Sequence, residues 1–277
     1  AECEPYITSD SYNMENYADD IEFAINTILK YIPFEKVIIG IENNKKKAIE
    51  KMCEIAERNE KVSVKVLPPV YPQGGEKVLV YHTTGKVAGE GMLPIDVGCV
   101  VCNTTTMQTF GKYLKTGMPL VSKCVTVDGL AICEGQNLIA PIGTSIRDLV
   151  DECGGFRDEP FKILYGGPMM GVSVYSVDSP ILKNTNAIIA LTKKETRDSG
   201  MTACIRCGRC AEHCPFGINP AAISNAYNKG ELDDCIRLGI NLCMECGCCS
   251  YICPARRPLV QNNRIIKAQL KNRKEEK

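Results

Sequence analysis

The first 70 residues switch between two hydrophobic periods, one typical of helices and one of strands. Apolar residues recur at helical spacing over 14–32 and again over 44–59. Between these segments lies a short apolar run at 36–42, and an alternating segment follows at 61–68. The order of strand, helix and strand predicts an α/β layer built on a parallel sheet.

Glycine and proline mark the boundaries in the stretch that follows. The sequence YPQGGEKVLVYHTTG at 71–85 predicts a turn and then a helix. A loop, a short strand through GCVVC and a helix are expected over 93–117. We therefore expect one α/β domain over 1–118.

The pattern changes at residue 119. Two or three strands are expected in PLVSKCVTVDGLAICEGQNLIAPIG, with turns at Asp128-Gly129 and after Gly135. One short helix is expected to begin after Thr144 as its N-cap and to stop at the glycine pair 154–155. FKILYGGPMMG is expected to be a last strand. Strands around one short helix favour a small β-grasp domain over 119–177.

The remaining part, 178–277, holds two short cysteine-rich runs. Two short helices are expected between the runs, and a polar helix is expected over 258–273. That last helix has few apolar residues to bury, which disfavours a role at a bilayer surface. We interpret 178–277 as an α-helical, ferredoxin-like domain.

Composition narrows the class of protein. The chain has 277 residues, of which 33 are basic and 33 acidic, so its net charge is zero. Affinity for nucleic acid needs a basic surface, so a nucleic-acid-binding protein is disfavoured. No run reaches the roughly 20 apolar residues of a membrane span. The opening AECEPYITSD is typical of the middle of a domain, so we expect the chain to be part of a longer protein.

The 17 cysteines carry the clearest chemistry. With no export signal, their crowding into two runs indicates metal ligands in a reducing cytosol rather than disulfides. Each run has the form C-x2-C-x2-C-x3-C-P, the bacterial ferredoxin pattern, in which the fourth cysteine ligates the other of two [4Fe–4S] clusters. The first cluster would then be held by Cys204, Cys207, Cys210 and Cys253, and the second by Cys243, Cys246, Cys249 and Cys214.

Two alternatives stay open for this array. Zinc also binds C-x2-C pairs, although zinc sites are usually built from two separated pairs. The second run contains a fifth thiol, Cys248, which is out of register with the other ligands. We interpret Cys248 as a small buried residue beside the cluster, with a regulatory or substitute ligand as the other reading.

The other cysteines and the two histidines fit ordinary structural roles better than metal binding. Cys99 and Cys102 form a C-x2-C pair inside an apolar, strand-like run, which favours packing. The two histidines, His82 and His213, are expected to be ordinary residues rather than ligands. The remaining cysteines without ligand spacing are Cys3, Cys53, Cys124, Cys133, Cys153 and Cys235.

Several blocks together resemble the C subunit of the Rnf complex, the ion-translocating ferredoxin:NAD⁺ oxidoreductase of bacterial membranes. These blocks are AECEPYITSD, YPQGGEKVLVY, LPIDVG, GGPMMG and ECGCCSYICPARRPLVQ, and they span essentially the whole chain. The last block includes Cys248, so the resemblance makes that thiol a family feature. The resemblance implies an α/β domain similar to the flavin- and NADH-binding subunit of respiratory complex I, then a soluble-ligand-binding β-grasp domain, then the two-cluster domain.

The resemblance also implies a flavin and nucleotide site in the first domain. By this likeness the FMN pocket includes Glu2, Cys3 and Glu4, the loop facing flavin and nicotinamide includes Gly74, Gly75 and Glu76, and Asn103 and Thr104 lie near the flavin. Taken alone, each feature also fits a charged loop, a turn or a helix end. The glycine-rich loop that would cradle the FMN phosphate is expected upstream of AECEP, outside these residues.

The function implied is electron transfer between NAD(H), FMN and two clusters in a membrane-bound, ion-translocating complex. The expected partners are NAD(H) and the other Rnf subunits, including the one that accepts ferredoxin, with a peripheral location on the cytoplasmic side of the membrane. The alternatives are an iron–sulfur adaptor without flavin, or a paralogous reductase subunit of cobalamin or proline metabolism. The cysteine array is common to all three.

Overall fold

A two-stranded parallel sheet organises the first part of the chain in this computed structural model, which describes residues 1–196 and 200–275. Strands β1 (Val37–Glu42) and β2 (Val62–Leu67) pair in parallel and are joined by helix α3 (Lys46–Arg58). Met52 and Ile55 of α3 are fully buried in the core beneath this crossover. The predicted order of strand, helix and strand is therefore confirmed.

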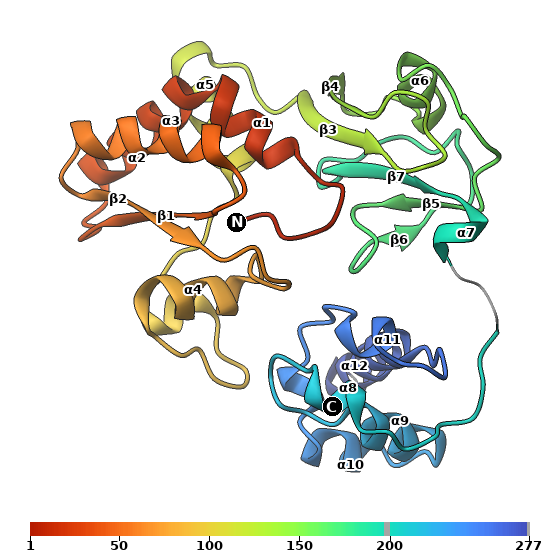
Figure 1. The fold of residues 1–277 in the computed structure, drawn as a ribbon. Coiled ribbons are helices and arrows are strands. Elements are labelled where there is room, and N and C mark those ends of the chain that lie inside the picture. Colours follow the sequence, from red (N-terminus) through yellow and green to blue (C-terminus); the bar gives the residue numbers. More distant parts are fainter. Residues whose placement is uncertain (197–199, 276–277) are drawn as a thin grey trace. The chain divides into compact units, whose positions relative to one another are not determined.

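Helices lie on both sides of this sheet (Figure 1). The helical segment predicted at 14–32 is divided at Tyr17 into α1 (Ser9–Asn16) and α2 (Ala18–Tyr31). Helix α5 (Thr104–Thr116) packs tightly against α2, since a Cβ at Gly111 would clash with the carbonyl oxygen of Asp20. Helix α4 (Glu76–Thr84) packs against β1, where Leu79 lies over Gly40.

The strand expected through GCVVC is absent from the described structure. A 3₁₀ helix, η1 (Pro94–Val97), is followed by irregular chain up to α5. Val100 is exposed, as is Cys102, so the apolar run does not enter a core. A strand needs a neighbouring strand to complete its hydrogen bonds, and the described sheet over β1 and β2 has no third strand here.

A second sheet of five strands follows. Its order is β4-β3-β7-β5-β6, with β3 parallel to β7 and the other neighbours antiparallel. The strands are β3 (Ser122–Asp128), β4 (Gln136–Pro141), β5 (Lys162–Tyr165), β6 (Val172–Ser173) and β7 (Ala187–Leu191). Helix α6 (Ile146–Glu152) packs on it through Ile146 and Leu149, which meet Val127 and Ile188 in one core.

Two expectations for this region were wrong in detail. The N-cap of α6 is Ser145, whose Oγ accepts the Asp148 N–H at 3.1 Å, while Thr144 donates to the carbonyl of Pro141 instead. The segment FKILYGGPMMG is not the last strand, because β7 follows it in the chain and pairs between β3 and β5 in the sheet. The sheet therefore continues past the boundary expected at residue 177.

The cysteine-rich part forms a separate helical unit. The chain divides into two compact units. The first consists of Ala1–Val87 and Val97–Arg197, and the second of Ala88–Asp96 and Asp198–Lys277. The short helix α7 (Lys193–Thr196) belongs to the first unit. The second unit holds α8 (Arg209–Glu212), α9 (Pro220–Asn228), α10 (Leu232–Arg237), η2 (Ile240–Leu242), α11 (Cys248–Tyr251) and α12 (Leu259–Glu275). The two helices predicted between the cysteine runs are α9 and α10, and the predicted polar helix is α12. Ile223, Ile240 and Ile266 are fully buried in their shared core.

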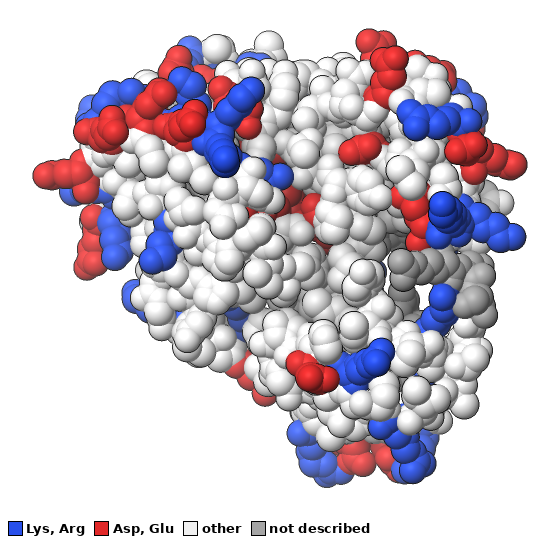
Figure 2. Space-filling model, in the orientation of Figure 1, with Lys and Arg blue, Asp and Glu red and all other residues white. Residues whose placement is uncertain are grey.

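The described surface mixes both signs of charge. In Figure 2 acidic and basic side chains lie next to one another over α2 and α3. Arg58 pairs with Glu22 at 2.7 Å, and Lys115 pairs with Asp20 at 2.7 Å. Within the described residues, no helix combines the length and the apolar character needed to cross a bilayer.

Candidate functional site

The two cysteine runs share one backbone conformation. Arg206 and Glu245, the residues before the second cysteine of each run, have φ of 56° and 62°. Gly208 and Gly247, which follow that cysteine, have φ of 77° and 82°. The left-handed region is open to glycine but costs other residues about 1–2 kcal/mol. Both runs therefore adopt the same strained loop, as expected of an internal repeat with one function.

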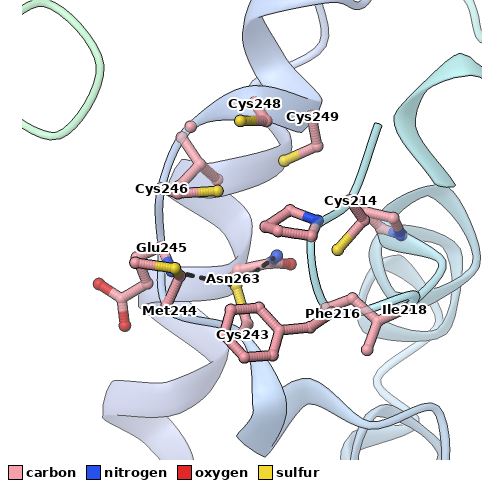
Figure 3. Close-up of a pocket in the computed structure, with 14 residues that line it drawn as sticks. Cys214, Phe216, Ile218, Cys243, Met244, Glu245, Cys246, Cys248, Cys249 and Asn263 are labelled. Atoms are coloured by element: carbon pink, nitrogen blue, oxygen red, sulfur yellow. Dashed lines mark hydrogen bonds between the residues drawn. The ribbon is translucent and has the colours of Figure 1, made fainter. Parts of the chain in front are cut away.

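One pocket in the second unit gathers cysteines from both runs (Figure 3). It is lined by Cys243, Cys246 and Cys249 of the second run and by Cys214 of the first. These are the four ligands that the exchange pattern assigns to one cluster. In Figure 3 the sulfur atoms of Cys214, Cys246 and Cys249 are directed toward the space that the residues surround.

The rest of this pocket is apolar apart from a few donors. Phe216, Ile218 and Val260 form part of its wall. The sulfur of Cys243 accepts hydrogen bonds from the backbone N–H of Glu245 at 3.4 Å and from Nδ2 of Asn263 at 3.3 Å. Donors aimed at a thiolate sulfur in apolar surroundings are typical of iron–sulfur sites, where they help set the reduction potential.

The other four expected ligands are only partly brought together. Cys210 and Cys253 pack against one small core that includes Cys249 and Val260. Cys204 and Cys207 are exposed. Burial, with Cys253 as a further contribution, raises the pKa of the Cys210 thiol. Cys210 of the first run and Cys253 of the second thus pack against the same small core.

The donors of this pocket bear on the kind of metal site that it could form. Across the described residues, no group of three cysteine, histidine or acidic side chains is close enough to hold a single metal ion. The four thiols, the N–H groups donated to Cys243 and the apolar wall fit a [4Fe–4S] cluster.

The out-of-register thiol lies at the edge of the same pocket. Cys248 begins α11 beside the buried Cys249 and is itself half-buried. Its pKa is raised by a hydrogen bond with Cys246 and by burial. Sequence register alone separates Cys249 from Cys248 as the ligand, because both thiols line the pocket.

A second cavity, of about 320 Å³, lies along the N-terminal segment. Glu2, Cys3 and Glu4 line it together with acidic residues from other elements, Glu42 and Asp128. It is therefore bounded by carboxylates from several parts of the first unit.

Burial changes the protonation of this segment. Desolvation, and then the nearby Asp10 carboxylate, raises the pKa of Glu2 to about 7. Desolvation also raises the pKa of Cys3 to about 11 and raises that of Glu4. A protonated carboxyl can donate a hydrogen bond as well as accept one.

Glu4 fastens this segment to the five-stranded sheet. Its carboxylate accepts the backbone N–H groups of Met169 at 3.1 Å and Met170 at 2.7 Å. A Cβ at Gly167 would clash with the Glu4 side chain, so this loop needs a glycine there. The block GGPMMG is thus a docking loop for the N-terminal segment, a role that the sequence did not reveal.

The glycine-pair loop contacts the same segment. The N–H of Gly74 donates to Sγ of Cys3 at 3.2 Å, and a Cβ at Gly74 would lie 2.6 Å from the carbonyl oxygen of Ala1. Gly75 is the N-cap of α4, and Glu76 is its exposed first residue. The structure therefore brings Gly74 to Cys3, while Glu76 has the position of a first-turn acid.

Asn103 and Thr104 lie at the start of α5. Oδ1 of Asn103 caps the helix by accepting the Thr105 N–H at 2.8 Å. Its Nδ2 donates to the carboxylate of Asp10 at 2.9 Å. The sequence analysis did not identify Asp10 as a contact of Asn103. Asp10 and Asn13 lie three residues apart on α1, and both are buried.

These residues fit only part of an FMN site. Among the described residues that line the second cavity, Lys45 is the one cation among several carboxylates. A phosphate group is normally held by backbone N–H groups of a glycine-rich loop or by cations, and carboxylates repel it. The described cavity therefore provides no phosphate cradle.

Family models match both parts of the chain. A model described as the Nuo51 FMN-binding domain matches residues 1–111, and one described as a 4Fe-4S binding domain matches residues 201–218. A solved structure of an NAD⁺-reducing [NiFe]-hydrogenase aligns with 70% of this chain and 39% of its own, at a TM-score of 0.52 and 14% identity. At that identity, the likeness supports the fold alone.

Curated relatives cover most of the chain. A Clostridium ljungdahlii protein, named as the C subunit of a proton-translocating ferredoxin:NAD(+) oxidoreductase complex, is 44% identical over 81% of this chain and 49% of its own length. The C subunit of a Rhodobacter capsulatus ion-translocating oxidoreductase complex is 38% identical over 100% and 54%. The C subunit of an Acetobacterium woodii Na(+)-translocating ferredoxin:NAD(+) oxidoreductase complex is 38% identical over 98% and 61%. The chain, which spans about half the length of the curated relatives it matches, is thus related over most of its residues to the family of C subunits of ion-translocating ferredoxin:NAD⁺ oxidoreductase complexes.

Proposed function

We propose that this chain carries two [4Fe–4S] clusters and relays single electrons between them. One cluster is held by Cys204, Cys207, Cys210 and Cys253, and the other by Cys243, Cys246, Cys249 and Cys214. The pocket that joins Cys214 to the three cysteines of the second run carries this proposal. A second support is the common left-handed loop of the two runs.

The chain is proposed to contain three domains of the intact protein. They are an α/β flavin- and NADH-binding domain over 1–118, a β-grasp soluble-ligand-binding domain that begins at 119, and a two-cluster domain. Support for the β-grasp domain comes from the central parallel pair β3 and β7, antiparallel outer strands and one packed helix. Because β7 completes that sheet, we extend this domain from residue 177 to residue 196.

The proposed activity is that of a ferredoxin:NAD⁺ oxidoreductase subunit in a membrane-bound, ion-translocating complex. In the intact protein, FMN would supply the conversion between two-electron and one-electron transfer. Glu2, Cys3, Glu4, Gly74, Gly75, Glu76, Asn103 and Thr104 are the residues of this chain proposed to border that site. The family model over residues 1–111 supports this part.

The proposed partners are the other subunits of the complex, including the iron–sulfur subunit that accepts ferredoxin. The proposed location is peripheral, on the cytoplasmic side of the cell membrane. The names of the relatives support membership of a multi-subunit complex.

Anaerobic purification of the full-length protein, followed by iron, zinc and flavin analysis and by reduction with NADH, tests this function. We expect two cubanes, one FMN and cluster bleaching on addition of NADH. Clusters without flavin, reduced by dithionite but not by NADH, would identify an electron-transfer adaptor instead. Zinc in place of iron would refute the proposal as a whole.

A further inference from the structure

Asn263 lies outside the cysteine runs and contacts the expected ligand set directly. It lies on α12, is fully buried, and lines the pocket beside Cys243 (Figure 3). Its Nδ2 donates to Sγ of Cys243 at 3.3 Å. The Asn263 amide therefore contacts the sulfur of an expected ligand that lies 20 residues earlier in the sequence.

Packing alone does not account for an asparagine at this position. Its Oδ1 is buried and has no hydrogen-bond partner in the described structure. An unpartnered buried polar atom is unfavourable, and a leucine would fill the same apolar surroundings without that penalty. The one polar contact that distinguishes Asn263 is the N–H donated to the cysteine sulfur.

The neighbouring chain holds this geometry in place. Lys267, one helical turn further along α12, donates to the carbonyl oxygen of Cys243 at 3.1 Å and pairs with Glu245 at 2.6 Å. Glu245 also pairs with Arg264 at 3.4 Å. Because Glu245 has a left-handed backbone and donates its own N–H to Cys243, this network fixes both donors relative to the sulfur.

We propose that Asn263 is a positioning residue that raises the reduction potential of the cluster held by Cys243, Cys246, Cys249 and Cys214. A hydrogen bond to a ligand sulfur withdraws negative charge, so it stabilises the reduced cluster, which carries one more electron, more than the oxidised one. This inference rests on the proposed function, because it requires the cluster to be present. It implies that the two clusters differ in reduction potential and that Asn263 is one cause of this difference.

The test is an anaerobic redox titration, followed by EPR, of the reconstituted chain carrying Asn263→Leu. We expect an unchanged iron content and a more negative midpoint potential for one cluster, the same one that Cys214→Ser perturbs. Asn262→Leu is the matched control, since the Asn262 amide lies on the same helix and donates to Ser224 Oγ at 3.0 Å rather than to a cysteine. Both potentials should be unchanged in this control.

Several results would overturn the inference and leave the proposed function intact. These are full iron content with both potentials unchanged, an equal shift of both potentials, or the same shift in Asn262→Leu. If Asn263→Leu loses iron, Asn263→Ala, which removes the amide donor without adding a charge or a bulkier side chain, makes the same comparison. Loss of iron in that variant too would show that Asn263 supports the fold rather than the potential. A wild-type chain without two cubanes would instead refute the proposed function.

Discussion

Cys248 and Cys249 are adjacent thiols, and only the second is in register with the other expected ligands. The register follows from the repeated spacing, so the sequence alone predicts it. The structure gathers Cys214 with the second run in one pocket, and the exchanged ligation itself stays a prediction. By contrast, the sequence did not predict Asn263, because a polar residue in a polar helix has no distinguishing pattern until the fold brings it to Cys243.

The first prediction separates the two adjacent thiols. Cys248→Ala should leave both clusters assembled and should lower the free energy of unfolding by about 1–2 kcal/mol, because a small half-buried group is lost. Cys249→Ala should lose one cluster. Iron analysis and EPR of the two variants check this. Retention of both clusters in Cys249→Ala, with loss of one in Cys248→Ala, would reverse the ligand assignment.

The second prediction concerns the buried carboxyl of Glu2. Its pKa is about 7 in the folded chain and 4.5 as the ordinary value, so folding favours the protonated form. The contribution of the Glu2 carboxyl to the free energy of unfolding is fully present below pH 4.5 and is lost as the pH rises through 7. Glu2→Gln should therefore stabilise the chain more at pH 8 than at pH 5, by at most about 3 kcal/mol.

Urea unfolding of wild type and Glu2→Gln at the two pH values gives this difference. Glu57→Gln, at an exposed position on α3, is the control substitution. A Glu2→Gln variant that is equally stable relative to wild type at both pH values would show that Glu2 is ionised like a surface acid.

At the scale of the element, Asn103 makes hydrogen bonds that stabilise both α5 and α1. Asn103 caps α5 and also donates to the buried Asp10 of α1. Asn103→Ala should cost about 2 kcal/mol, because it removes a cap worth about 1 kcal/mol and a partner of a buried carboxylate. Ser145→Ala, which removes only the cap of α6, should cost about 1 kcal/mol. Equal costs in denaturant unfolding would mean that the Asp10 contact contributes nothing.

Elements with a strong period were predicted well, and those defined by tertiary pairing were not. The spacing of apolar residues predicted α2, α3, β1 and β2 closely. The apolar run GCVVC looks like a strand, yet it has no strand beside it in the described structure, so it stays irregular. Strand β7 was missed because its apolar run follows a long irregular segment, and its place between β3 and β5 is a long-range contact.

At the scale of the whole molecule, the exchanged cysteines make the two runs dependent on each other. Cys253→Ser should perturb the cluster bound by Cys204, Cys207 and Cys210, even though Cys253 belongs to the second run. The packing of Cys253 and Cys210 against one core supports this pairing. EPR of the reduced variant should show the change in that cluster. Damage confined to the cluster bound by Cys243 would contradict the exchange.

The central claim is that this one chain binds two cubanes. The most direct measurement is the iron, sulfide and zinc content of the anaerobically reconstituted chain. The account predicts about eight irons and about eight sulfides per chain, since two complete sets of four cysteines are present. About four irons per chain, or one to two zinc ions in place of iron, would contradict it.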